Sequence, residues 1–315
     1  MLAAKKHVLV LLMTYGSPAT LDDVQAYLRS VRGGREPEAA LVAEFRRRYD
    51  LIGGSPLLRI TRAQAAALEA ELNGLEDENS YAVAAGMRFS PPFIADVLRA
   101  QAPESGLVVG VIMSPQFSPT IMGGYLKALH EGVVQLHRDG LALRIATDWH
   151  LQPYFLEALA GRVREAIDRM PAGVRDDVPV LLTAHSMPRR VVDGEPGYIK
   201  QLEETAAAVA ELAGLTESRW MFCYQSAGHT PEEWLKPDFA DVMPQLRDAG
   251  HSHVLIAPVQ FLADHLEILY DIDVGARDQA KKAGIDFARI ESLNTSPLFI
   301  KALSGVVQDV LAKAD

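Results

Sequence analysis

The run Val8-Leu9-Val10-Leu11-Leu12-Met13, followed at once by the turn Tyr15-Gly16-Ser17-Pro18, sets the pattern for the whole chain. The run is apolar at every position and does not alternate, which is typical of a parallel strand covered on both faces. A helical pattern follows the turn, and Thr20 with Asp23 predicts a capping box at the start of that helix. A strand that leads into a helix in this way indicates an α/β fold.

Further short apolar runs, separated by helical patterns, extend this alternation to the end of the chain. We expect eight strands, at Val8–Met13, Tyr81–Met87, Leu107–Met113, Leu143–Thr147, Val178–Ala184, Met221–Tyr224, His253–Phe261 and Phe287–Glu291. Thr61 with Gln64 predicts a second capping box, before a helix at Ala65–Leu72. The repeated strand–helix order favours parallel sheets joined by right-handed crossovers.

The length of 315 residues and a faint internal echo both favour two domains. Ile112–Phe117 and Ile256–Phe261 are both apolar strands that end in a proline and then Gln-Phe, about half the chain apart. This echo favours two sheets of four strands over one sheet of eight. We expect an N-terminal domain at 1–148, a C-terminal domain at 149–296 and a last helix at 297–315 that packs back on the first domain.

Composition and charge exclude several classes of protein. The chain has 41 acidic and 31 basic residues, which argues against a general nucleic-acid binder. The single cysteine, Cys223, leaves no disulfide framework and no iron–sulfur cluster held by this chain's own thiolates. The first apolar run lacks the small-residue cleavage pattern of a signal peptide and leads straight into a turn, and no stretch reaches the roughly 20 apolar residues of a membrane span. We therefore expect a cytoplasmic protein.

Ligands of an open parallel sheet bind beyond the carboxyl ends of its strands, so the loops after the apolar runs are the places to search. The loop after the first run holds a single glycine, and no strand end shows a dinucleotide, P-loop or Gly-x-Ser-x-Gly pattern. Nicotinamide, nucleotide and esterase functions therefore lose their main support. Tyr15, in this first loop, is either a packing residue or a ligand.

Two potential metal ligands follow two other strands. His185 directly follows the fifth apolar run, and Glu267 follows the seventh. If the segment around Glu267 is helical, Asp264, Glu267 and Asp271 share one face and form an acidic ladder. The alternatives are a structural histidine and a solvated acidic helix face. Two ligands are too few for a tight structural site, so a metal would be held briefly and passed on.

A cationic stretch stands out in this acidic chain. It contains Arg32, Arg35, Arg46, Arg47, Arg48 and Arg59. Arginine pairs bidentately with carboxylates, so the stretch is either a solvated helix face or a rim that grips an anionic organic ligand. With His185 and Glu267, the rim suits a protein that handles a divalent metal and a carboxylate-bearing ligand together.

The chain resembles the ferrochelatase family, and in particular the coproporphyrin III ferrochelatases of the Gram-positive-type haem pathway. The segments that carry the resemblance are Leu11–Pro18, Arg48–Leu57, Thr183–Pro188, Tyr224–Pro237 and Pro258–Asp271. They fall in the family's order and cover nearly the whole chain. The resemblance implies two similar Rossmann-like domains, each a four-stranded parallel sheet flanked by helices, of the class II chelatase type. It also implies that the porphyrin binds in a cleft between them.

The resemblance implies a role for each matching residue. His185 and Glu267 match the family's catalytic and metal-binding pair, and Tyr15 matches the tyrosine that contacts the porphyrin and ligates product iron. The expected porphyrin contacts are Tyr15, Arg32, Arg48, Tyr49, Ser55 and Tyr125, and Asp271 matches part of an outer metal site. Gly275 stands where some relatives carry another carboxylate, which implies a weaker outer site, and Phe89 stands where some carry histidine.

The implied function is insertion of Fe²⁺ into coproporphyrin III to give Fe-coproporphyrin III, with Fe²⁺ as a substrate and no resident cofactor or iron–sulfur cluster. The alternatives are a protoporphyrin IX ferrochelatase, a cobalt or nickel chelatase of the same fold, and a non-catalytic haem or metal carrier. The expected partners are the two substrates, with transient contact to neighbouring haem-pathway enzymes, and the expected state is a monomer.

Overall fold

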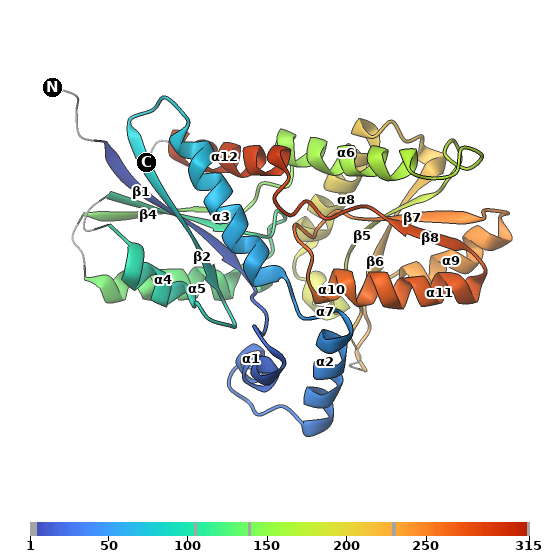
Figure 1. Ribbon diagram of the computed structural model, residues 1–315, viewed down its shortest axis with the longest axis horizontal. Coiled ribbons are helices and arrows are strands. Elements are labelled where there is room, and N and C mark those ends of the chain that lie inside the picture. Colours follow the sequence, from blue (N-terminus) through green and yellow to red (C-terminus); the bar gives the residue numbers. More distant parts are fainter. Residues whose placement is uncertain (1–4, 104–105, 138–139, 229–230, 314–315) are drawn as a thin grey trace. The chain divides into compact units, whose positions relative to one another are not determined.

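The computed structural model describes residues 5–103, 106–137, 140–228 and 231–313. The chain folds into two compact units, each built on its own sheet (Figure 1). Unit 1 comprises Met1–Pro115, Pro119–Trp149 and Asn294–Asp315, and unit 2 comprises Gln116–Ser118 and His150–Leu293. His229 and Thr230, in one of the segments that carry the resemblance, and the last two residues of the predicted helix 297–315 lie outside the described residues.

Unit 1 is a four-stranded parallel sheet flanked by helices. Its strands are β1 (Lys6–Thr14), β2 (Asn79–Met87), β3 (Gly106–Ile112) and β4 (Leu141–Ala146), in the spatial order β2-β1-β3-β4. Its helices are η1 (Leu21–Asp23), α1 (Val24–Val31), α2 (Ala39–Leu51), α3 (Leu57–Asn73), α4 (Ile94–Gln101), α5 (Pro119–Leu136) and α12 (Pro297–Ala312).

Unit 2 repeats this topology. Its strands are β5 (Val180–His185), β6 (Trp220–Gln225), β7 (His253–Pro258) and β8 (Asp286–Arg289), all parallel, in the spatial order β6-β5-β7-β8. Its helices are α6 (Pro153–Asp168), α7 (Arg189–Val192), α8 (Pro196–Leu212), η2 (Glu217–Arg219), α9 (Phe239–Asp248), α10 (Leu266–Leu269), the π-helix η3 (Asp271–Ala276) and α11 (Arg277–Ala283).

The predicted α/β class, with two four-stranded parallel sheets, is confirmed. All eight predicted strands form, and the inner strand β1 is fully buried from Val10 to Met13, as its unbroken apolar run requires. The internal echo falls on β3 and β7, which occupy the same position in their two sheets. The proline and the Gln-Phe pair of each segment therefore lie at topologically equivalent strand ends.

Of the two predicted capping boxes, one forms. Asp23 Oδ2 accepts hydrogen bonds from the Thr20 backbone N–H at 2.9 Å and from the Thr20 hydroxyl at 2.8 Å. The box predicted at Thr61 and Gln64 is wrong, because the apolar residues before Thr61 already belong to α3, which begins at Leu57. Thr61 Oγ1 instead donates to the carbonyl of Leu57, four residues earlier, at 2.9 Å.

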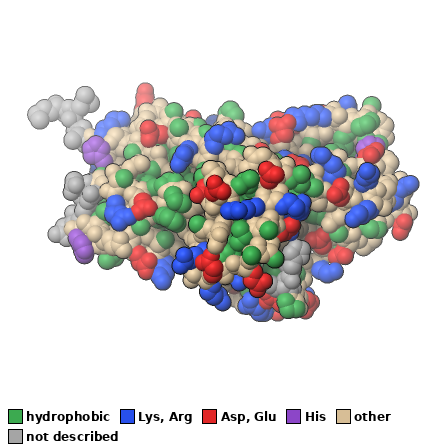
Figure 2. Space-filling view, turned by 60° about the horizontal axis from the view of Figure 1, so that its bottom comes forward, with side chains coloured by type: hydrophobic (Ala, Val, Ile, Leu, Met, Phe, Trp, Pro, Cys, Tyr) green, Lys and Arg blue, Asp and Glu red, His purple; other side chains and the backbone are tan. Residues whose placement is uncertain are grey.

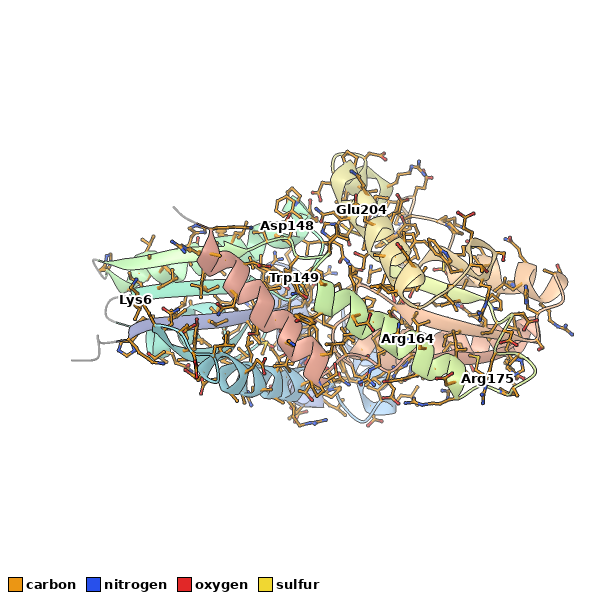
Figure 3. All side chains as sticks on the ribbon, turned by 90° about the horizontal axis from the view of Figure 1, so that it is seen from above. Lys6, Asp148, Trp149, Arg164, Arg175 and Glu204 are labelled. Atoms are coloured by element: carbon orange, nitrogen blue, oxygen red, sulfur yellow. The ribbon has the colours of Figure 1, made fainter. Side chains whose placement is uncertain are left out.

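The polypeptide passes from unit 1 to unit 2 between Trp149 and His150, and each residue is held by its own unit. Trp149 Nε1 donates to the carbonyl of Ile112 at 3.1 Å, whereas His150 Nε2 lies 3.0 Å from Glu204 Oε2 on α8. Trp149 and Glu204 are labelled in Figure 3. The side-chain hydrogen bond of Trp149 lies within unit 1 and that of His150 lies within unit 2, which agrees with a boundary between these two residues.

The last helix, α12, packs within unit 1. Arg144 Nη1 on β4 donates to the carbonyl of Leu311 at 3.1 Å, and the ring of Phe299 lies 6.5 Å from that of Trp149.

On the face shown in Figure 2, Lys and Arg side chains are interspersed with Asp and Glu side chains. None of the described helices combines the length and the apolar composition needed to span a membrane.

Candidate functional site

His185 is the last residue of β5, an inner strand that is buried from Val180 to Ala184. The adjacent backbone is held against β6, where the Ser186 N–H donates to the carbonyl of Gln225 at 2.7 Å. The imidazole Nδ1 is hydrogen-bonded to the carbonyl oxygen of Ser186, and a carbonyl can only accept, so Nδ1 carries the hydrogen. The Nε2 lone pair of neutral His185 is therefore available to take up a proton or bind a metal.

Glu267 lies on α10, a single helical turn that directly follows His265. Its Oε1 lies 3.8 Å from His185 Nε2, and its Oε2 lies 3.4 Å from His265 Nε2. His265 Nδ1 is hydrogen-bonded to the carbonyl of Ala263 at 2.9 Å, which turns Nε2 toward the carboxylate. The structure thus brings the predicted pair His185 and Glu267 together and adds His265.

The charges of this cluster favour an ionised Glu267. Burial opposes ionisation of the Glu267 carboxyl, but His185 and His265 outweigh it and lower its pKa to about 2. Burial likewise opposes protonation of His265, but Glu267 outweighs it, with a smaller contribution from Asp271, and the pKa of His265 is raised. The result is a carboxylate that stays negative beside an imidazole that readily carries a proton.

The predicted acidic ladder of Asp264, Glu267 and Asp271 is wrong as a single helix face. The helix begins only at Leu266, so Asp264 lies outside it, and Asp271 begins the π-helix η3, which changes the spacing. Asp264 Oδ1 accepts from the Ser292 hydroxyl at 2.7 Å and pairs with Arg289 at 3.4 Å. Its carboxylate is therefore committed to structural contacts.

Arg289, at the end of β8, is the centre of this structural cluster. Its guanidinium binds Asp273 on η3 through two hydrogen bonds, of 2.7 and 2.9 Å, besides the contact with Asp264. The three side chains are between 16% and 25% exposed. Arg289 thus ties η3 and the start of the His265–Glu267 segment to the sheet.

On unit 1, Tyr15 lies in the loop that follows β1 and is 44% exposed. Its ring centroid lies 4.5 Å from that of Phe89, and its carbonyl accepts from the Phe89 N–H at 3.0 Å. Gly16 permits this turn, because its φ is +94° and a Cβ there would lie 2.5 Å from the hydroxyl of Ser90. The Tyr15 ring is therefore presented on a fixed backbone.

Arg88 joins Phe89 and Tyr125 into one cluster with Tyr15. Its guanidinium carbon lies 4.6 Å from the ring centre of Phe89 and 5.3 Å from that of Tyr125, within the range of cation–π contacts. A Cβ at Gly124 would collide with this guanidinium at 2.0 Å, so glycine leaves room for it. Tyr125 is buried at 5% exposure, and burial raises the pKa of its phenol.

The remaining predicted porphyrin contacts differ in how free their side chains are. Arg32 is exposed at the C-terminus of α1, and within the described residues its guanidinium makes no hydrogen bond or ion pair. Arg48 Nε donates to Glu44 Oε1 at 2.8 Å, so a ligand carboxylate would share it with Glu44. Tyr49 is buried at 3% exposure, and Ser55 Oγ accepts from the Leu57 N–H at 3.4 Å.

The sequence patterns did not identify His265 or Arg88 as site residues, although the position of each in the sequence could have indicated it. Arg88 is the first residue after β2, a strand end of the kind searched for ligands. His265 stands two residues before Glu267. The participation of Arg289 was beyond sequence reasoning, because its partners come from two other segments.

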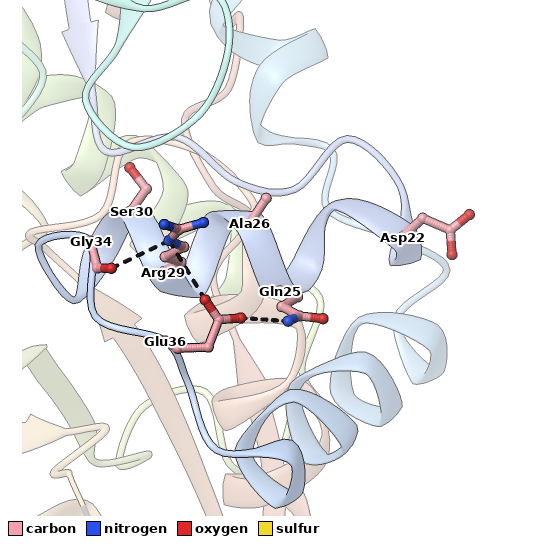
Figure 4. Close-up of a pocket in the computed structure, with 7 residues that line it drawn as sticks. All are labelled: Asp22, Gln25, Ala26, Arg29, Ser30, Gly34 and Glu36. Carbon is pink, nitrogen blue, oxygen red and sulfur yellow. Dashed lines mark hydrogen bonds and ion pairs between the residues drawn. The ribbon is translucent and has the colours of Figure 1, made fainter.

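A surface pocket is lined by none of these site residues. It is formed on and beside α1 and lined by Asp22, Gln25, Ala26, Arg29, Ser30, Gly34 and Glu36 (Figure 4). Gln25 Nε2 donates to Glu36 Oε1 at 2.5 Å, and Arg29 lies 3.6 Å from the same carboxylate. Gln25 and Arg29, two of the polar side chains that line this pocket, therefore both contact the Glu36 carboxylate.

Comparison with known proteins identifies relatives along the whole chain. The family model for ferrochelatase matches residues 7–311. A ferrochelatase of Herpetosiphon aurantiacus is 38% identical over 301 residues, which are 95% of this chain and 97% of the relative. Coproporphyrin III ferrochelatases of Geobacillus thermodenitrificans and Bacillus subtilis are 37% and 34% identical, over 98% of this chain and 98% and 100% of theirs.

Solved structures support the fold. SirB from Bacillus subtilis with Fe³⁺ aligns with a TM-score of 0.56 at 10% identity, over 98% of this chain and 96% of SirB. CbiX, described as the terminal enzyme for biosynthesis of sirohaem in denitrifying bacteria, aligns with a TM-score of 0.52 at 12% identity, over 98% of this chain and 100% of CbiX. The extent of the family match, together with the identity to curated relatives, confirms the resemblance: the chain belongs to the ferrochelatase family and is a metal chelatase.

Proposed function

We propose that the chain inserts Fe²⁺ into coproporphyrin III to form Fe-coproporphyrin III. The observation that carries this proposal is the pair formed by His185 and Glu267, in which a lone pair on Nε2 lies 3.8 Å from a carboxylate oxygen. Insertion forms iron–nitrogen bonds and releases the two pyrrole N–H protons, so the protein must supply a proton acceptor and tolerate an entering dication.

The pair meets both needs. His185 accepts a pyrrole proton at Nε2, because its other ring nitrogen, Nδ1, is already engaged with the Ser186 carbonyl. Glu267 stays ionised, because His185 and His265 lower its pKa to about 2 against the effect of burial. Its negative charge reduces the cost of bringing Fe²⁺ to the site and stabilises the imidazolium that forms.

Binding of the propionates gives the cationic residues a catalytic purpose. A planar macrocycle hides its nitrogen lone pairs, and a site that binds it bent exposes them. Strain of about 1–5 kcal/mol can be supplied by contacts with remote parts of a substrate. Arg32 and Arg48 are the proposed partners of propionates, with Arg32 the less engaged of the two.

Three features support coproporphyrin III as the porphyrin. Relatives at 34–37% identity over nearly the full chain carry the name coproporphyrin III ferrochelatase. The exposed Arg32 suits a substrate with four propionates, which offers more anionic groups than the two of protoporphyrin IX. Tyr15 is 44% exposed, and a tyrosine oxygen can ligate ferric haem iron, so we propose it as a ligand of the product iron once dioxygen has oxidised that iron from the ferrous to the ferric state.

The test is a comparison of kcat/KM for Fe²⁺ insertion into coproporphyrin III and into protoporphyrin IX. Both porphyrins are assayed anaerobically under one detergent condition, after EDTA treatment and removal of zinc. The proposal predicts a higher kcat/KM with coproporphyrin III. Equal or higher values with protoporphyrin IX contradict the choice of substrate, and porphyrin binding without any insertion of iron supports a carrier and contradicts the enzymatic role.

A further inference from the structure

The main-chain N–H of His185 has an unusual partner. The parallel pairing of β5 with β7 runs from Val180 with Leu255 to Thr183 with Pro258, and the Val259 N–H then donates to the Thr183 carbonyl at 2.9 Å. Alternate residues of a strand face the same neighbour, so the next N–H of β5 on this side is that of His185. It donates to a side chain, Gln260 Oε1, at 2.9 Å. The Gln260 amide thus replaces the main-chain acceptor where the ladder ends.

The other end of this amide is also held. Gln260 Nε2 donates to the hydroxyl of Tyr198 on α8 at 2.5 Å. Tyr198 is 1% exposed, so its ring is fixed by packing. Because an N–H must face the amide oxygen, the amide NH₂ is left for Tyr198, and the two contacts together determine which way the amide points.

Gln260 also begins the segment that leads to Glu267. Leu262 and Ala263 are both buried at 6% exposure, and the ring of Phe261 lies 4.8 Å from that of His265. The segment between Gln260 and Glu267 is therefore packed at several points. A displacement at Gln260 would change the position of His185 relative to the carboxylate that faces it.

We infer that Gln260 is a positioning residue, which fixes the main chain of His185 opposite Glu267, and that Tyr198 orients its amide. This inference rests on the proposed role of His185 in iron insertion. Displacing a reacting group by about 1 Å costs on the order of 100-fold in rate, so a lost backbone anchor is expected to lower kcat much more than it weakens porphyrin binding.

The chain offers a matched control for this inference. Gln116 occupies the corresponding place after β3 in the internal echo and is fully buried. Its Nε2 donates to the Thr205 hydroxyl at 3.0 Å, and this hydrogen bond involves neither His185 nor Gln260. Gln116→Leu therefore removes a buried amide of the same kind without touching the proposed anchor.

The experiment compares Gln260→Leu, Gln260→Glu, Tyr198→Phe and Gln116→Leu with the wild type. For Gln260→Leu we expect kcat to fall on the order of 10- to 100-fold, with porphyrin affinity changed less than about threefold. Gln260→Glu keeps an oxygen for the His185 N–H and accepts from the Tyr198 hydroxyl, so it retains most of the activity. Tyr198→Phe causes a smaller loss than Gln260→Leu, and Gln116→Leu behaves as wild type.

A second measurement separates this inference from the proposed function. The imidazole resonances of His185 are followed by NMR in histidine-labelled protein, which needs no turnover. We expect them to shift in Gln260→Leu and Tyr198→Phe and to stay in place in Gln116→Leu. Unshifted resonances, or equal kcat losses in Gln260→Leu and Gln116→Leu, overturn the inference. If Gln260→Leu does not fold, Tyr198→Phe decides it by the same NMR criterion. If the wild-type protein does not insert iron, the proposed function is overturned, whereas the anchoring of His185 by Gln260 is still decided by the NMR measurement.

Discussion

Glu267 Oε2 lies 3.4 Å from His265 Nε2, while its other oxygen faces His185 Nε2 at 3.8 Å. One carboxylate thus lies within reach of two imidazoles that come from different segments. Burial alone would raise the pKa of Glu267, and the two histidines reverse that effect. This relationship leads directly to a prediction about pH.

Replacing His265 should raise the pKa of the Glu267 carboxyl. In the wild type this pKa is about 2, below its ordinary value of 4.5, so the carboxylate stays charged, and the stabilisation of the fold that follows from the lowered pKa is lost progressively as pH falls from 4.5 to about 2. His265→Gln removes one of the two lowering groups, so the carboxylate is protonated at a higher pH. The measurement is a pH titration of the Glu267 side-chain carboxyl carbon followed by NMR.

His253→Gln is the control for this titration. His253 Nε2 lies 3.5 Å from Asp286 Oδ2, which is another histidine–carboxylate pair and is not part of the candidate site. We expect Glu267 to titrate in this variant as it does in the wild type. A Glu267 pKa that does not rise in His265→Gln contradicts the role given to His265.

Arg289→Leu should destabilise the protein. The substitution leaves Asp273 and Asp264 largely buried without the cation that pairs with them. Removing one partner of a buried ion pair costs about 3–5 kcal/mol, and the partial exposure here favours the lower end. Urea denaturation measures this loss. Arg169→Leu breaks a 2.5 Å pair with Glu291 whose side chains are 59% and 56% exposed, so it should cost less than about 1 kcal/mol. Equal losses would contradict the account.

Arg32→Ala should weaken binding of coproporphyrin III. A charge-assisted hydrogen bond contributes about 1.5–3 kcal/mol, which corresponds to roughly a 10- to 150-fold rise in Kd. The loss should be smaller for protoporphyrin IX, which carries fewer carboxylates. Arg29→Ala on the same helix is the control, because Arg29 already contacts Glu36 and the carbonyl of Gly34 (Figure 4). Fluorescence-quenching titrations that show equal affinity for wild type and Arg32→Ala would contradict this contact.

Tyr15→Phe should change the spectrum of bound product more than it changes turnover. Removing the phenol oxygen takes away the proposed iron ligand and leaves the ring packed against Phe89. After the bound product has been oxidised in air to its ferric form, we expect a shifted Soret band and an altered high-spin signature. Tyr154→Phe, at another exposed tyrosine on α6, is the control. A product spectrum identical to that of the wild type would exclude Tyr15 as a ligand.

Much of the fold could be predicted because buried parallel strands have a strong sequence signature. Runs such as Val8–Met13 are apolar at every position only when both faces are covered. The error at Thr61 arose because a capping pattern also occurs inside a helix, where the hydroxyl binds the carbonyl four residues earlier.

The residues and contacts of the candidate site could likewise be predicted only in part. His185 and Glu267 could be found because one ends a strand and the other follows a strand, and the carboxyl ends of parallel strands meet at one edge of a sheet. The engagement of Arg48 by Glu44 could not be assigned in advance, since the same arginine pattern also fits a free cationic rim. The ties of Asp264 to Arg289 and of Gln260 to His185 depend on contacts across 25 and 75 residues of chain.

The central claim is that His185 and Glu267 carry out iron insertion. It is tested most directly by single-turnover Fe²⁺ insertion into coproporphyrin III by wild type, His185→Ala and Glu267→Gln, with porphyrin binding measured on the same samples. We predict that each variant loses on the order of 100-fold or more in the insertion rate, the range expected for loss of acid–base catalysis, while binding coproporphyrin III nearly as tightly as wild type. Near-normal insertion by either purified variant would contradict the account.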